Sequence, residues 1–455
     1  MAIKTVKFGG SSLADSVQIK KAAGIIKSDP ARRYVVPSAP GVRFAGDKKV
    51  TDMLYACYGV ARNGGDVRAA FAEIRNRFDG IIQELDLDLS LEREYDEIIE
   101  NIITRRRNMP YGEPEKISSN YAASRGEYLN GKILAEFLGF EFVDAADVIL
   151  FDENGKLLLD ESVNALRQRL DGAENAVIPG FYGKVKDCSY DKIVTFSRGG
   201  SDITGSIVAN AVKADVYENW TDVSGFLVAD PRIVDSPEVI DTVTYRELRE
   251  LSYMGATVLH EDAVFPVRAA GIPVNIRNTN SPECRGTFIM PDLDDADIPP
   301  YIITGIAGKK GFASVNIEKT MMNTEIGFCR KVLGVFEDSG ISIEHMPSGI
   351  DTMSVFISRK ELDGREQLIR SQIQESVSPD KIEFEYGLAL LAVVGRGMRH
   401  TRGVAGRIFS ALAHAKINVV MIDQGSSELN IIIGVSEECF EEAVRCIYAI
   451  FVDTK

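Results

Sequence analysis

The stretch "VKFGGSSLAD" (residues 6–15) decides the fold of the first part of the chain, because an apolar run stops at two glycines and a helical pattern follows. From residue 14 to residue 27 apolar side chains recur at helical spacing, and Pro30 closes the segment. A second run, "RYVVPSAPG" (residues 33–41), contains Pro37, so we expect a bulge or a turn at its end. Strand, turn, helix and strand in this order predict an α/β domain with a parallel sheet.

Lys7 is the chemically informative residue of the first stretch. A lysine just before the turn projects at the carboxyl-terminal edge of the sheet, and Gly9 and Gly10 let the backbone approach a ligand. We expect Ser11 or Ser12 to cap the following helix, whose N-terminal amides favour negative charge. The order K-x-G-G therefore predicts a phosphate site whose lysine comes from the strand. The alternative is an exposed lysine before an ordinary turn.

Three further stretches carry candidate functional side chains. In "TFSRGGSD" (residues 195–202), Arg198 offers a planar fork to a carboxylate, and Asp202 could bind an ammonium or help place a metal. In "NWTDVSGFLVADPR" (residues 219–232), a strand ends in polar residues and a turn carries both signs of charge. In "SRGEYLNGKILAEFLG" (residues 124–139), Glu127 lies on a predicted helix whose apolar positions face the core. The alternative for Glu127 is a solvated position on the helix surface.

Composition and charge exclude several classes of protein. The 455 residues are too many for one core and predict roughly two to four domains. A net charge of −15 and a pI near 5.0 oppose general nucleic-acid binding, which needs a basic face. The six cysteines and four histidines are not paired at ligand spacing, so we expect no structural zinc site. No apolar run reaches membrane length and no signal peptide precedes Lys4, so we expect a reduced, cytoplasmic protein.

The last third of the chain repeats itself. The acidic, proline-containing run "DLDDADIPPY" (residues 292–301) is interpreted as an interdomain linker. Beyond it, similar residues recur 76 positions apart, as at Gly327 and Gly403. Each copy has the pattern strand, Gly-led helix, strand, turn, strand, helix, which predicts two related α+β modules. The final residues "IFVDTK" (450–455) are interpreted as a last strand.

Taken together, the motifs resemble those of the aspartate kinases of the amino-acid kinase family. The matching motifs, in the family's order and at its approximate spacing, are "KFGGSSLAD", "SAPG", "SRGE", "RGGSD", "WTDV", "DPR" and "GATVLH". The tandem repeat resembles the paired ACT modules that follow the catalytic domain in that family. The resemblance implies a three-layer α/β, amino-acid-kinase-like catalytic domain with a mainly parallel sheet at residues 1–297. It also implies two ferredoxin-like α+β regulatory modules at residues 302–386 and 387–455.

The resemblance implies an aspartate kinase, which uses ATP to phosphorylate the side-chain carboxylate of L-aspartate to 4-phospho-L-aspartate. This reaction is the first step of the pathway to lysine, threonine and methionine. A carboxylate with a pKa near ~4 is ionised at pH ~7 and needs no general base, so positioning and charge neutralisation remain. One departure from the family is Thr257, which stands where a lysine is usual. Two alternatives stay open: another carboxylate kinase of the same fold, such as a glutamate kinase, and an amino-acid sensor with a weakened nucleotide site.

The resemblance also implies roles for individual residues. Lys7 and Asp202 would be catalytic. ATP, with Mg²⁺ held mainly by ATP and water and by no dedicated protein ligand, would bind Lys7, Phe8, Gly9, Gly10, Thr221, Asp222, Asp230 and Arg232. L-Aspartate would bind Ser38, Thr51, Glu127, Arg198, Gly199, Gly200, Ser201 and Asp202.

A regulatory site is expected in the first repeat, because the interface strands and turns of ACT-like modules hold free amino acids. Glu344 would bind an ammonium, whereas the second repeat has Val420 at the equivalent place. A side-chain ammonium suits L-lysine better than threonine, so we expect feedback inhibition by L-lysine through a dimer or higher homo-oligomer of the first modules. The residues expected to form this site are Met322, Ile326, Gly327, Phe328, Ile343 and Glu344.

Overall fold

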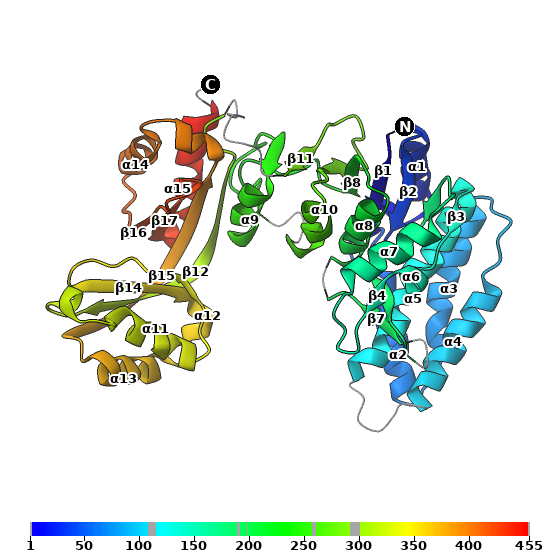
Figure 1. The fold of residues 1–455 in the computed structure, drawn as a ribbon, viewed down its shortest axis with the longest axis horizontal. Helices are drawn as coiled ribbons and strands as arrows, with labels where there is room; N and C mark the ends of the chain where they lie inside the picture. Colours follow the sequence, from blue (N-terminus) through cyan, green and yellow to red (C-terminus); the bar gives the residue numbers. More distant parts are fainter. Residues whose placement is uncertain are drawn as a thin grey trace. The chain divides into compact units, whose positions relative to one another are not determined.

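The computed structural model describes residues 2–107, 115–188, 192–197, 199–256, 261–291 and 301–453. The chain divides into two compact units, which appear in the ribbon of Figure 1. The first consists of Met1–Phe226, Asp241–Tyr245 and Val258–Asp292, and the second of Leu227–Ile240, Arg246–Thr257 and Leu293–Lys455. None of the helices in the described residues combines the length and the apolar character that a membrane span requires.

The first unit is built on an eight-stranded sheet with the order β3-β5-β2-β1-β8-β10-β11-β9. Its strands are β1 (Lys4–Phe8), β2 (Arg32–Pro37), β3 (Glu141–Phe142), β5 (Ala176–Val177), β8 (Val216–Thr221), β9 (Thr242–Thr244), β10 (Val274–Asn278) and β11 (Thr287–Met290). Among these pairs only β10 and β11 run antiparallel. The prediction of a mainly parallel α/β sheet is therefore confirmed. A smaller sheet joins β4 (Leu150–Phe151), β6 (Tyr182–Val185) and β7 (Ile193–Thr195).

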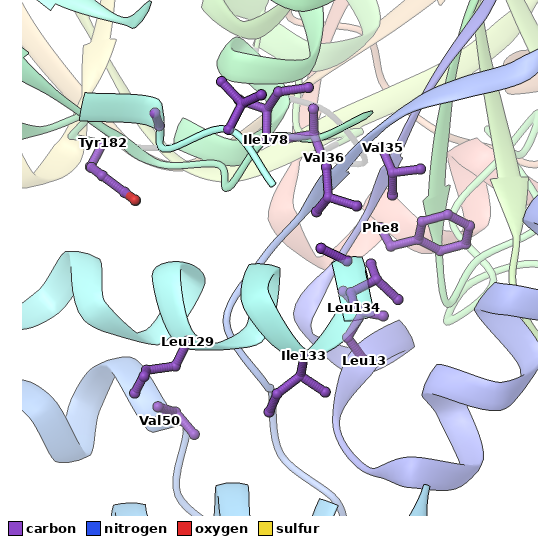
Figure 2. Packing of buried hydrophobic residues seen from close by; sticks show 14 of the residues in the cluster. Phe8, Leu13, Val35, Val36, Val50, Leu129, Ile133, Leu134, Ile178 and Tyr182 are labelled. Atoms are coloured by element: carbon purple, nitrogen blue, oxygen red, sulfur yellow. The ribbon is translucent and has the colours of Figure 1, made fainter. Parts of the chain in front are cut away.

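Helices connect these strands, as the crossovers of a parallel sheet require. They are η1 (Gly10–Leu13), α1 (Ser16–Lys27), α2 (Val50–Arg62), α3 (Val67–Glu84), α4 (Glu92–Arg107), α5 (Glu115–Leu138), α6 (Ala145–Val148), α7 (Leu159–Arg169), α8 (Gly200–Ala211), η2 (Glu261–Val264) and α10 (Phe265–Ala269). The apolar face predicted for α5 is buried: Leu129, Ile133 and Leu134 are fully enclosed. Figure 2 shows them in one cluster with Phe8 of β1 and Leu13 of η1.

The turn after β1 differs from the prediction at its cap. Asp15, not Ser11 or Ser12, caps α1, because its carboxylate accepts the Gln18 amide at 2.9 Å. Both serines lie inside η1, which ends before Asp15 and the start of α1. Ser12 is buried, and its hydroxyl is hydrogen-bonded to the hydroxyl of Thr279 at 2.7 Å. At the neighbouring strand, Pro37 is the last residue of β2, so the expected turn follows the strand.

The second unit contains a six-stranded sheet with the order β13-β14-β12-β15-β17-β16, paired antiparallel throughout. Its strands are β12 (Gly305–Glu318), β13 (Ile343–His345), β14 (Thr352–Ser358), β15 (Lys381–Val394), β16 (Met421–Asp423) and β17 (Asn430–Ser436). Its helices are α9 (Tyr245–Tyr253, whose first residue belongs to the first unit), η3 (Met322–Thr324), α11 (Phe328–Asp338), α12 (Arg359–Leu362), α13 (Glu366–Val377), η4 (Arg396–His400), α14 (Val404–His414), η5 (Glu437–Cys439), α15 (Phe440–Tyr448) and η6 (Ala449–Asp453).

The element order confirms the internal repeat. Strand, helix, two strands and helix follow one another twice, from β12 to α13 and from β15 to α15. Gly327 and Gly403 are equivalent residues, and both cap their helices in the left-handed conformation with φ 82°. Because L side chains rarely adopt that conformation, both positions favour glycine for the same physical reason.

The two longest strands belong to both repeats. Residues 305–310 of β12 pair with the second half of β15, whereas residues 312–318 pair with its first half and with β14. The pairing shifts register around Gly311 (φ 92°), and Gly387 (φ 70°) lies at the matching place in β15. The two repeats therefore share one continuous sheet.

The C-terminal segment is helical, so the strand predicted at residues 450–455 is wrong over the part that the structure describes. Residues 449–453 form η6, and residues 454–455 lie outside the described residues. Ile447 and Tyr448 of α15 are buried, and Phe451 and Val452 bury the next turn on the same helical spacing. The β-branched and aromatic composition that suggests a strand here serves an amphipathic helix.

Candidate active site

Lys7 and Asp202, the two residues predicted to be catalytic, form an ion pair. The Lys7 Nζ lies 2.6 Å from the Asp202 Oδ1, and the Lys7 side chain is mostly buried. Asn219 lies beside Lys7 in the parallel pairing of β1 and β8, and its Nδ2 donates to the Asp202 Oδ1 at 2.8 Å. Asp202 stands in the first turn of α8, where the helix dipole stabilises a carboxylate. The carboxyl end of β1 and the start of α8 thus bring a positive and a negative group into direct contact.

The glycine turn after Lys7 is fixed by close packing against the loop after β2. A Cβ on Gly10 would lie 2.9 Å from the Ala39 carbonyl oxygen, and one on Gly41 would lie 2.6 Å from the Gly10 carbonyl carbon. The Gly41 amide donates to the Gly10 carbonyl at 2.8 Å. The Gly9 amide donates to the Trp220 carbonyl at 3.0 Å, so this amide already has a partner within the sheet.

Phe8 is a core residue. Its ring is fully buried and stacks on Trp220 with 5.9 Å between centroids. Any contact of Phe8 with a nucleotide is therefore through its backbone. The stacked pair also joins β1 to β8, the two strands whose ends carry Lys7 and Thr221.

Glu127 is buried, so the alternative of a solvated glutamate is wrong. Glu127 on α5 is 5% exposed, and the Ala39 backbone amide favours the ionised form of its carboxylate. No described residue donates to its Oε2. Burial raises the pKa of Glu127 to about 8, against the smaller opposing effect of that amide. A cation beside Glu127 would therefore stabilise the ionised form of its carboxylate.

The remaining residues predicted to bind aspartate lie on two loops and two helices. Ser38 follows β2, and its carbonyl accepts the Asn130 amide at 2.7 Å. Thr51 stands in the first turn of α2, half-buried. The α8 start packs tightly, because a Cβ on Gly180 would lie 2.5 Å from the Ser201 Cβ and one on Gly200 would lie 2.7 Å from the Phe181 ring. Gly199 adopts the left-handed conformation at φ 57°. Arg198 lies outside the described residues.

The residues predicted to border the nucleotide fall in different units. Thr221 ends β8 in the first unit, and its hydroxyl contacts the carboxylate of Asp222 at 3.3 Å. Asp230 and Arg232 belong to the second unit, where they form an exposed ion pair of 2.6 Å. Thr257 lies outside the described residues.

Sequence reasoning missed three residues that shape the site. Asn219 stands two residues before Thr221, on the same face of β8, and Asn130 stands one helical turn after Glu127, so spacing alone could have indicated both. Arg77 of α3 has no such signal. Its buried guanidinium donates to the carbonyls of Ala14 at 3.1 Å, Lys48 at 2.8 Å and Gly41. Arg77 thereby ties the loop after β2 to the start of α1.

The residues predicted to form the regulatory site lie together around the start of α11 and on β13. Met322 and Phe328 are buried, Gly327 caps α11, and Ile326 is 98% exposed. Ile343 and Glu344 lie on β13, and the Glu344 carboxylate accepts a hydrogen bond from the Tyr253 hydroxyl at 2.5 Å. The Tyr253 pKa is raised to about 12, first by burial and then by Glu344.

The described residues contain no group of three or more histidine, cysteine, aspartate or glutamate side chains arranged to hold a metal ion. At the Lys7 end of the sheet, the Asp202 carboxylate is already committed to Lys7 and Asn219. With Asp202 occupied in this way, these side chains suit a cation that keeps most of its ligands from a bound molecule and water.

Comparison with known proteins adds the following. The sequence model of the amino acid kinase family matches residues 3–278, and that of an ACT domain matches residues 391–451. Aspartokinase 3 of Bacillus subtilis is 40% identical over 99% of this chain and 98% of its own length. Aspartokinase 1 (chloroplastic) of Arabidopsis thaliana is 30% identical over 99% of this chain and 80% of its own length.

The solved structures that resemble the whole chain include the following two. The aspartate kinase of Clostridium acetobutylicum, described as an allosteric enzyme, has a TM-score of 0.89 and 48% identity over 100% of both chains. Escherichia coli aspartokinase III, solved with lysine and aspartate, has a TM-score of 0.72 over 99% of both chains. At 24% identity, this second likeness concerns the fold alone.

Proposed function

This chain belongs to the amino acid kinase family, and within it to the aspartate kinases, and we propose that it transfers the γ-phosphoryl group of ATP to the side-chain carboxylate of L-aspartate. The products are ADP and 4-phospho-L-aspartate. The observation that carries the assignment is the match over the full length of two aspartate kinases, at 40% and 48% identity. The reaction would then stand at the head of amino-acid biosynthesis from aspartate.

Lys7 and Asp202 are proposed to separate when the substrates bind. In the ligand-free ion pair each neutralises the other at 2.6 Å. The substrate ammonium would take the place of the Lys7 ammonium beside Asp202, which frees Lys7 for the phosphate oxygens. The acceptor carboxylate is already ionised, so the chain needs no general base and contributes positioning and positive charge.

L-Aspartate is proposed to bind between the loop after β2, the buried part of α5 and the start of α8. Glu127 would receive the α-ammonium, and Ser38, Thr51 and residues 199–201 would line the pocket. Arg198 would clamp a carboxylate through its planar fork. Because the Glu127 pKa is raised to about 8, the empty site holds this carboxyl largely protonated at neutral pH, and ammonium binding would release that proton.

ATP is proposed to lie along the carboxyl ends of β1 and β8, against Lys7, the Phe8 backbone, the Gly9–Gly10 turn, Thr221 and Asp222. Mg²⁺ would reach the site on the nucleotide phosphates, because it keeps most of its ligands as phosphate and water oxygens. It would supply charge neutralisation for the phosphates.

The regulatory proposal is feedback inhibition by L-lysine. The catalytic domain would span residues 1–297, with ACT-like modules at residues 302–386 and 387–455 and dimers formed through the first modules. Glu344 would bind the lysine side-chain ammonium beside the Gly327 turn.

All six cysteines are free, which suits a reduced, cytoplasmic setting.

The experiment is an assay of ADP formation with ATP, Mg²⁺ and L-aspartate, with the acyl phosphate trapped as its hydroxamate. L-Glutamate in place of L-aspartate tests the acceptor, and added L-lysine tests the regulation. Aspartate-dependent ADP and hydroxamate support the proposal. Turnover with glutamate alone, or ADP formation that ignores the acceptor, contradicts it.

A further inference from the structure

Asn130 on α5 is a buried polar residue for which neither the motifs nor the comparisons give a role. Its side chain is fully enclosed, and its Nδ2 donates to the Ser38 carbonyl at 2.7 Å. Because a carbonyl oxygen accepts only, this bond identifies the amide nitrogen and directs the Oδ1 elsewhere. No described residue donates to that Oδ1.

Glu127 stands three residues earlier, on the same face of α5. The two side chains act on one peptide group, because the Ala39 amide favours the ionised form of Glu127 while Asn130 donates to the Ser38 carbonyl. Each side chain keeps a buried acceptor oxygen without a donor, Oε2 on Glu127 and Oδ1 on Asn130. Once Glu127 is ionised, both oxygens are buried acceptors without a donor, which is costly, so the pair beside one loop indicates a shared donor group on the ligand.

We propose that Asn130, together with Glu127, binds the α-ammonium of the substrate and selects an α-amino acid over a dicarboxylate that lacks the amine. This inference rests on the proposed function, because it concerns the aspartate pocket of that reaction. An ammonium has three N–H donors, and the two free oxygens would take two of them. The third would remain for Asp202, at the start of α8.

The chemistry of the pair suits one ammonium. An ionised Glu127 supplies one negative charge, and Asn130 adds a second strong acceptor without a second buried charge. Two carboxylates in these places would repel each other and keep one proton. The amide therefore completes the ammonium site while its nitrogen fixes the loop that carries Ser38.

The rival role for Asn130 is structural: its amide simply pins the Ser38 carbonyl. The two roles differ in their effect on a ligand without an amine. A residue that only pins the loop affects aspartate and succinate alike, because both ligands share the same two carboxylates. A residue that binds the ammonium affects aspartate alone.

The experiment measures the dissociation constants of L-aspartate and succinate by calorimetry in the wild-type chain, Asn130→Ala and the milder Asn130→Ser. We expect Asn130→Ala to raise the dissociation constant of aspartate by about tenfold, which is the effect of one hydrogen bond to a charged group. The dissociation constant of succinate should stay within about twofold of the wild-type value. Asn210→Ala is the matched control, because the Asn210 amide also donates to a backbone carbonyl, that of Pro266 at 3.0 Å. This control substitution should leave the dissociation constants of both ligands unchanged.

Parallel weakening of aspartate and succinate in the Asn130 variants would overturn the proposal, as would unchanged aspartate binding. If Asn130→Ala does not fold, the aspartate-to-succinate ratio in Asn130→Ser decides. ADP formation by the wild-type chain is measured in the same preparations. Turnover with an unchanged ratio rejects the role of Asn130 alone, whereas a wild type without aspartate-dependent turnover rejects the proposed function.

Discussion

The carboxylate of Glu344 accepts a hydrogen bond from the hydroxyl of Tyr253 at 2.5 Å, so the residue proposed to bind the effector ammonium already has a partner. Tyr253 is the last residue of α9 and is also bound by Lys309. The Lys309 ammonium donates to the Tyr253 carbonyl and lies 5.3 Å from the centroid of the Tyr253 ring. Four residues later comes Thr257, in the motif where the family carries a lysine. An ammonium that binds the same carboxylate oxygen, Oε2 of Glu344, must displace or share this hydroxyl.

The first prediction follows from that competition. Tyr253→Phe removes the competing donor, so half-maximal inhibition by L-lysine should need a few-fold lower concentration than in the wild type. Glu344→Ala removes the acceptor, so the required concentration should rise by about tenfold or more. Inhibition curves at fixed ATP and aspartate measure both. Equal sensitivity of Glu344→Ala and wild type would place the effector elsewhere.

The second prediction concerns the buried ion pair. Lys7→Ala and Asp202→Ala should each lower kcat by ~10²–10³, because each removes a preorganised charge at the reacting groups. Circular dichroism should show an intact fold. Lys20→Ala is the control, since this exposed lysine only donates to the Glu84 carbonyl at 2.9 Å. An Asp202→Ala enzyme within a few-fold of wild-type turnover contradicts the assignment.

The third prediction is a pH dependence of stability. The Glu127 pKa is raised to about 8 in the folded chain, above its value of about 4.3 in an unfolded chain. Between these values the unfolded state loses this proton and the folded state keeps it. The contribution of Glu127 to the free energy of unfolding is therefore fully present below about pH 4.3 and is lost as the pH rises to about 8.

Melting temperatures at pH ~5.5, ~6.5 and ~8 without substrate test this prediction in wild type and Glu127→Gln. The variant keeps the shape of the side chain and cannot ionise, so its melting temperature should fall less over this range. All other titrating groups are common to the two proteins. Identical pH profiles would show that Glu127 titrates normally in the folded chain.

The fourth prediction concerns Arg77 as a positioning residue. Arg77→Lys keeps the charge but cannot reach the three carbonyls of Ala14, Gly41 and Lys48 together, so the loop after β2 should lose its fixed position. We expect kcat/KM for aspartate to fall by roughly tenfold, with a smaller change in KM for ATP. Arg75→Lys, an exposed position on the same helix, is the control. Equal kinetics of the two variants would deny Arg77 this role.

Much of the fold could be predicted because local signals and global packing agree. The glycine turn after β1, the period of α5 and the 76-residue repeat all lead to elements that the structure contains. The cap of α1 could not be predicted in this way, because Ser11 and Ser12 belong to the short helix η1 and Asp15 caps α1. The last segment carries strand-forming residues, yet its burial on a helical spacing decides its conformation.

The candidate site could be predicted only where a motif carries its chemistry in one stretch. Lys7 and Asp202 lie beside Gly-Gly turns, and the structure brings them together. The burial of Glu127 depends on Ala39 and on the helices packed around α5, which local sequence does not reveal. Arg77 contacts three carbonyls in two loops from a separate helix, so its role follows from tertiary structure alone.

The shared strands β12 and β15 have a consequence for dissecting the chain. A fragment of residues 387–455 would lack residues 305–310, which supply the strand next to the second half of β15. Its new edge would expose unpaired backbone groups and invite edge-to-edge aggregation. For the second repeat to fold alone, residues 305–310 would have to be joined to residues 387–455 in one chain. Each repeat thus contains backbone that the other repeat needs for its sheet. A gene fusion or truncation therefore has to keep β12 and β15 together.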